Sequence, residues 1–174
     1  MLTVRRGRLS GAVSMSDGNS MGNGPLLRPG EIQRMTAGTG VTHSESNPSK
    51  EESVHLYQIW ILSKRNEPRP GHEQERFGPD ETLNCLRLVV SPDGADGSLE
   101  IDSDTRLQRG VIRANMSVSL DLGTGWYSWV PVASGAIQPN VYMRDAGDDL
   151  AASNEPRLTI RSKSDAEVLV FDLP

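Results

Sequence analysis

The chemistry that this sequence could support starts at the tripeptide His43-Ser44-Glu45. In a β-strand, residues i and i+2 point to the same face, so His43 and Glu45 would project together. An imidazole nitrogen and a carboxylate oxygen form a ligand pair that suits Fe(II), Mn(II) or Zn(II). The spacing alone leaves two interpretations open, half of a metal site or a polar loop pair that faces water.

Three further residues with reactive side chains are isolated from one another. His55 stands in a strand-like apolar run, where a lone histidine is either a half-buried structural residue or a ligand. His72 lies in a charged Pro/Gly-rich segment, and we expect it to be solvated. Cys85, the single cysteine, is expected to pack at the start of an apolar strand, and it excludes an internal disulfide.

Other motifs are weaker or absent. Asp145, Asp148 and Asp149 cluster in a Gly-containing loop, which favours an acidic surface turn over a site for a hard cation. The Gly-rich stretch before Pro25 is not followed by Lys-Ser/Thr, so a phosphate-binding loop is not predicted. The Gly-x-Ser-x-Gly nucleophile motif is also absent from the sequence.

Short β-strands must position these residues. Runs of β-branched and aromatic residues alternate with Gly/Asp turns at close spacing, which is typical of an all-β sandwich or barrel. The clearest run is Val54–Leu62, and a helical turn is predicted only at Asp148–Ala152. The other predicted strands are Leu2–Arg5, Leu9–Val13, Ile32–Thr36, Val41–Glu45, Leu86–Val90, Leu99–Ile101, Val111–Arg113, Met116–Leu122, Trp126–Val132, Val141–Met143, Leu158–Ile160 and Glu167–Phe171.

Composition limits the partners and the compartment. The chain has 174 residues, a net charge of −5 and one cysteine. This acidic balance argues against direct contact with nucleic acid or an anionic membrane. No apolar stretch is long enough for a transmembrane helix, and none of signal-peptide length follows Arg5, Arg6 and Arg8. We therefore expect a cytoplasmic protein.

Several motifs together resemble the pirin family. The run Leu27-Arg28-Pro29-Gly30-Glu31-Ile32-Gln33-Arg34-Met35-Thr36-Ala37-Gly38-Thr39-Gly40-Val41-Thr42-His43-Ser44-Glu45 is similar to the second metal motif of pirins. The likeness continues through His55–Ile61, resumes at Leu88–Leu99 and ends with Ala166–Pro174. It is strongest to the bacterial members described as quercetin 2,3-dioxygenases.

The resemblance implies two tandem cupin barrels, which are double-stranded β-helix or jelly-roll folds. It places a remnant of the N-terminal barrel at 1–66, a crossing linker at 67–83 and a C-terminal cupin-like barrel at 84–174. In the family, three His and one Glu hold a non-haem iron in the first barrel. His43 and Glu45 match the third His and the Glu, so Fe(II) or another divalent metal is the expected cofactor. Glu45 is also the expected catalytic base.

The sequence departs from the family pattern before His43. Pirins carry a His-x-His pair on an earlier strand, and no histidine precedes His43 here. We therefore expect an N-terminally truncated chain whose first barrel is incomplete, with loose metal binding from two ligands. A misplaced start codon or a decayed gene copy would also explain the pattern. An incomplete barrel exposes strand edges, which favours association into a homo-oligomer.

Three functions follow from the resemblance. The first is iron-dependent oxygenation of a flavonol such as quercetin, impaired by the incomplete site. The second is a non-catalytic, metal-responsive regulator that binds a protein partner. The third is a truncated copy without function.

Overall fold

The computed structural model of the protein describes residues 1–5, 15–19, 26–66 and 69–174. These residues are mainly β-strands, as predicted. The chain divides into two compact units, Met1–Phe77 and Gly78–Pro174. No described helix has the length and apolar character that a membrane span requires.

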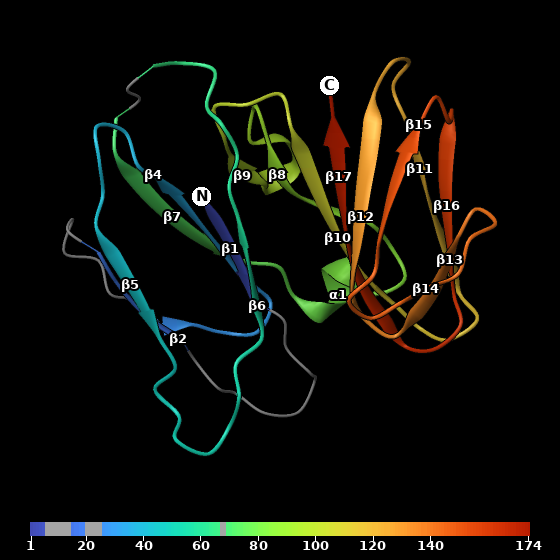
Figure 1. Ribbon diagram of the computed structural model, residues 1–174, viewed down its shortest axis with the longest axis horizontal. Helices are drawn as coiled ribbons and strands as arrows, with labels where there is room; N and C mark the ends of the chain where they lie inside the picture. Colours follow the sequence, from blue (N-terminus) through green and yellow to red (C-terminus); the bar gives the residue numbers. More distant parts are fainter. Residues whose placement is uncertain (6–14, 20–25, 67–68) are drawn as a thin grey trace. The chain divides into compact units, whose positions relative to one another are not determined.

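The first unit contains two antiparallel sheets (Figure 1). The larger has the strand order β6-β1-β4-β7 and the smaller has the order β3-β2-β5. The strands are β1 (Leu2–Arg5), β2 (Met15–Asn19), β3 (Leu26–Leu27), β4 (Glu31–Thr36), β5 (His43–Ser46), β6 (Leu56–Ile59) and β7 (Gly71–Arg76).

Alternation along β1 and β4 gives the larger sheet two different faces. Leu2, Val4 and Ile32 lie on one face and are at most 2% exposed. Thr3 and Gln33, which are register partners, lie on the other face and are each 1% exposed. The turn before β4 uses Gly30 at a φ of 84°, a left-handed conformation that glycine adopts without a steric penalty. One face therefore buries apolar side chains such as Leu2 and Ile32, and the other buries the polar side chains of Thr3 and Gln33.

The second unit contains a six-stranded sheet of order β15-β12-β17-β10-β8-β9 and a four-stranded sheet of order β11-β16-β13-β14. Its helical segments among the described residues are α1 (Pro79–Thr82) and a 3₁₀ turn at Ala95–Gly97. The strands are β8 (Arg87–Ser91), β9 (Leu99–Glu100), β10 (Arg106–Ile112), β11 (Ser117–Asp121), β12 (Tyr127–Ser134), β13 (Ala136–Pro139), β14 (Arg144–Asp145), β15 (Asp149–Ser153), β16 (Arg157–Ser162) and β17 (Ala166–Leu173).

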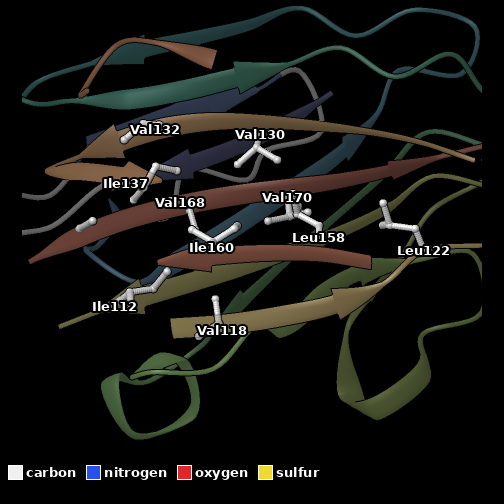
Figure 2. Packing of buried hydrophobic residues seen from close by; sticks show 11 residues of the cluster. Ile112, Val118, Leu122, Val130, Val132, Ile137, Leu158, Ile160, Val168 and Val170 are labelled. Carbon is white, nitrogen blue, oxygen red and sulfur yellow. The ribbon is translucent and has the colours of Figure 1, made fainter. Parts of the chain in front are cut away.

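Branched aliphatic side chains fill the space inside the second unit. Figure 2 shows Val130, Val170 and Leu158 close together, with Val168 and Ile160 beside them. All five are fully buried and come from strands of both sheets. This interdigitation of the two layers is the hydrophobic core that holds the unit together.

Gly135 joins the two sheets of this unit. It lies between the last residue of β12 and the first residue of β13, and its φ is 75°. A Cβ at this position would overlap the carbonyl oxygen of Asp165 and would lie 2.8 Å from the Cα of Ala166. The chain can pass from one sheet to the other here only because the residue has no side chain.

Most predicted strands are present, but three segments differ. Val141–Met143 is a turn rather than a strand, because Asn140 has a φ of 48° and the Tyr142 N–H bonds to the Pro139 carbonyl. Residues 148–152 do not form a helical turn, because β15 pairs along β12 instead. The predicted linker 67–83 contains β7, which pairs with β4, and also α1. The predicted strand Leu9–Val13 lies outside the described residues.

Candidate functional site

Strand β5 places His43 and Glu45 on the same face, as their spacing predicts. Both residues are partly buried, whereas Ser44 and Ser46 between and after them are exposed. The strand pairs with β2 in a register that sets Asn19 opposite His43 and Asp17 opposite Glu45. The local geometry therefore matches the prediction for these two residues, and their role as metal ligands stays a prediction.

The Glu45 carboxylate is held from the neighbouring sheet by two donors. The Thr3 hydroxyl on β1 donates to Oε1 over 3.0 Å, and the Gln58 amide on β6 donates to Oε2 over 2.6 Å. Because Thr3 and Gln58 are direct cross-strand partners, they approach the carboxylate side by side. Glu45 thus links the two sheets of the first unit.

A second polar contact lies on the same face of the larger sheet. The Gln33 Nε2 and His72 Nε2 atoms are 2.6 Å apart. At this separation the amide and the imidazole share a hydrogen bond. His72 is therefore not the solvated linker residue that the sequence predicted. It is a partly buried residue of β7, opposite Met35 in the β4–β7 register.

His43 and Glu45 fit a divalent metal in donor type. They supply one nitrogen and up to two oxygens from one strand face, and each carboxylate oxygen keeps a lone pair beyond the hydrogen bond that it accepts from Thr3 or Gln58. Within residues 1–5, 15–19, 26–66 and 69–174, no group of three or more His, Cys, Asp or Glu could hold a metal. The described site consists of two donors.

The remaining candidates belong to other segments of the chain. His55 is exposed just before β6, and its ring lies beside that of Tyr57 at an interplanar angle of 37°, with the centroids 5.5 Å apart. Cys85 is exposed, which corrects the prediction that it packs, because it precedes β8 and its thiol lies 2.9 Å from the Glu81 carbonyl oxygen. In the acidic turn, the Asp145 N–H donates to the Asp148 carboxylate.

Thr3 and Gln58 are site residues that the sequence reasoning missed. Both stand in strands that were predicted, but their contact with Glu45 spans 42 and 13 residues of sequence respectively. The available signal was Gln58 itself, a lone amide inside the apolar run Leu56–Ile61. A polar residue in such a run requires a partner when its face is covered.

Known proteins match both halves of the chain. A family model described as Pirin matches residues 8–61, and one described as Quercetinase C-terminal cupin domain matches residues 88–173. A protein of Escherichia coli K12 named quercetin 2,3-dioxygenase is 40% identical over 166 residues, which cover 95% of this chain and 70% of that protein. The chain belongs to the pirin family.

Solved structures agree with this assignment to the pirins. The chain superposes on YhhW from E. coli with a TM-score of 0.90 and 37% identity, covering 99% of this chain and 70% of that one. A structure of the same bacterial pirin in complex with nickel(II) gives a TM-score of 0.86 and 38% identity, covering 99% and 71% of the two chains. The predicted fold, tandem cupin barrels of the pirin type, is confirmed.

Proposed function

We propose that this pirin-family chain binds a divalent metal through His43 and Glu45 and acts on a flavonol as a 2,3-dioxygenase, with activity lowered by its two-donor site. The observation that carries the proposal is the shared face of the two residues on β5, with Glu45 held in place by Thr3 and Gln58. The E. coli relative named quercetin 2,3-dioxygenase and the nickel(II) complex of a bacterial pirin support the substrate class and the metal.

In this proposal, His43 and Glu45 have distinct roles. His43 and Glu45 would bind the metal, which when present supplies Lewis acidity and redox chemistry toward dioxygen. Glu45 also has the chemistry to accept the proton of a flavonol hydroxyl. Because each of its oxygens already accepts a hydrogen bond, a proton would have to reach the second lone pair of one of them.

Iron content and Fe(II) affinity of the full chain test the metal site. The comparison is with the double variant His43→Ala/Glu45→Ala and with His55→Ala, which removes an exposed histidine outside the site. We expect iron in the wild type and in His55→Ala, and none in the double variant. Absence of iron from all three proteins would contradict the metal site.

Oxygen uptake with quercetin and added Fe(II) tests the reaction. We expect uptake slower than that of the E. coli relative, because two protein ligands leave the metal less firmly placed than a full set. Uptake that is unchanged in His43→Ala/Glu45→Ala would show that free iron, not the protein site, is responsible.

The alternative is a metal-responsive regulator that binds a protein partner. The observation that favours it is the exposed apolar turn Val141–Met143, whose side chains are 74%, 58% and 49% exposed. Exposed apolar clusters of this kind occur at protein-binding surfaces. Capture of one reproducible partner, and loss of that partner in the variant Tyr142→Ser/Met143→Ser, would support this role. Sedimentation velocity would test the separate expectation of a homo-oligomer.

A further inference from the structure

A row of polar side chains crosses the whole larger sheet of the first unit. The register aligns Gln58 of β6, Thr3 of β1, Gln33 of β4 and Gln74 of β7. Thr3 and Gln33 are each only 1% exposed. Buried polar groups of this kind are normally hydrogen-bonded, so their partners indicate the structural role of the row.

The row faces the smaller sheet and contacts it at both ends. At one end, Thr3 and Gln58 donate to the two oxygens of Glu45 on β5. At the other end, the Gln74 amide donates to the Leu26 carbonyl of β3, over 3.2 Å. The contacts at Glu45 differ from the contact at Leu26, because they involve a charged group of a candidate metal ligand and engage both of its oxygens.

Two donors on one carboxylate restrict how that carboxylate can move. A glutamate side chain has three rotatable bonds, and a single hydrogen bond still allows the group to turn about its own axis. Donors to Oε1 and to Oε2 from adjacent strands remove that freedom. Ligating carboxylates in metal sites are commonly held in this way by hydrogen bonds from outside the metal shell.

We propose that Thr3 and Gln58 are positioning residues that fix the orientation of the Glu45 carboxylate. The inference rests on the proposed function in so far as Glu45 is a metal ligand. Thr3 is buried and holds Oε1, while Gln58 is exposed and holds Oε2. The two residues keep the carboxylate oriented in the metal-free chain, so that little reorganisation accompanies metal binding.

The substitutions that test the proposal keep the shape of each side chain. Thr3→Val replaces the hydroxyl with a methyl group of similar volume, and Thr3→Ser restores the hydroxyl. Gln58→Leu removes the amide at an exposed position, where folding is least affected. Gln58→Glu places a second carboxylate beside Glu45 and replaces the donor with an acceptor.

Calorimetric titration of the full chain with Ni(II) is the first measurement. We expect Thr3→Val and Gln58→Leu each to weaken Ni(II) binding about 10- to 100-fold, the range seen when hydrogen-bond partners of metal ligands are removed. Thr3→Ser should restore the affinity, which a merely structural role of Thr3 would not require. Unchanged affinity in both variants, with binding still lost in Glu45→Ala, would overturn the positioning role and leave the metal site intact.

If the wild type binds no Ni(II), the proposed metal site is contradicted, but the positioning role of Thr3 is not. A double-mutant cycle on the metal-free chain then tests the positioning role. The urea midpoints of wild type, Thr3→Val, Glu45→Ala and the double variant are compared. If Thr3 holds Glu45, the two losses are not additive, because either change breaks the same contact. Additive losses would overturn the proposal.

Discussion

The two units of this protein fill their interiors differently. The face of the larger sheet that meets β5 in the first unit carries Thr3, Gln33 and Gln58, and Thr3 and Gln58 reach β5 through hydrogen bonds. The main core cluster of the second unit consists of aliphatic residues such as Val130 and Val170, and the buried charged pair Arg109–Glu167 is not part of that cluster. The sheets of the first unit are joined in part by side-chain hydrogen bonds, whereas those of the second unit are joined mainly by aliphatic packing. The polar contacts of the first unit include the two hydrogen bonds that hold the candidate site residue Glu45.

The largest expected effect concerns the charged pairs of the two units. In the second unit, Arg109 and Glu167 are 5% and 6% exposed and lie 2.8 Å apart. Glu167→Gln should cost about 3–5 kcal/mol of unfolding free energy, because it leaves a buried guanidinium without its counter-ion. Hydrogen exchange of the β10 amides measures the loss.

The matched change in the first unit is Glu73→Gln. The Arg34–Glu73 pair is 3.0 Å long, but the Glu73 side chain is 48% exposed. Loss of this ion pair should lower the free energy of opening, measured by hydrogen exchange of the β4 amides, by at most about 1 kcal/mol. Equal effects of the two substitutions would contradict the difference between the units.

A cavity in the second core should have the next largest effect. Leu158 is fully buried within the main cluster, so Leu158→Ala should destabilise the unit by about 2–5 kcal/mol. Urea unfolding followed by Trp126 and Trp129 fluorescence, in a Trp60→Phe background, reports on this unit. Leu62→Ala, at a position that is 91% exposed, is the control and should stay within about 0.5 kcal/mol.

The smallest effect concerns the pH dependence of the second unit. Burial raises the pKa of the Asp172 carboxyl above its usual value, against a weaker lowering by the Arg106 guanidinium. A raised folded-state pKa gives stability that is present below the ordinary aspartate pKa and is lost as the pH rises through the raised value. Asp172→Asn should therefore stabilise the protein at neutral pH relative to wild type, and this gain should disappear in acid.

Asp165 provides the control of opposite sign. The Ala114 N–H and then the Arg113 guanidinium lower the pKa of its carboxyl. Its contribution to stability is present above the ordinary aspartate pKa and is lost as the pH falls through the lowered value. Asp165→Asn should therefore destabilise at neutral pH, with the difference from wild type vanishing in acid. A change in stability of the same sign in Asp172→Asn and Asp165→Asn at neutral pH would contradict the opposite pKa shifts of the two carboxyls.

The sequence predicted elements whose signals are local. Glycine turns such as Gly30 and Gly147 adopt positive φ, and the apolar run of β17 forms a strand. The predictions failed where pairing decided the structure. The polar sequence of β7 carries no strand pattern, and it becomes a strand because β4 offers a partner along its whole length. Val141–Met143 has strand-like residues but no partner strand among the described residues.

In the candidate site, too, local features were predicted and features that depend on strand pairing were not. His43 and Glu45 are two residues apart, so the strand period alone places them on one face. The contacts from Thr3 and Gln58 depend on the order and register of three strands in two sheets, which no single segment of sequence encodes. The Gln33–His72 contact has the same origin, because it requires β4 and β7 to pair.

Gly135 has a consequence at the level of the gene. Every missense change of its codon adds a side chain, and even the smallest one would overlap the backbone at Asp165 and Ala166. Gly125 and Gly147 differ from Gly135 in this respect, because a Cβ at either position would meet no atom within 4 Å. A saturation library selected for soluble expression should therefore retain only synonymous codons at 135. Positions 125 and 147, whose φ values of 79° and 93° strain most side chains, should accept chiefly residues that tolerate a positive φ, such as Asn and Asp.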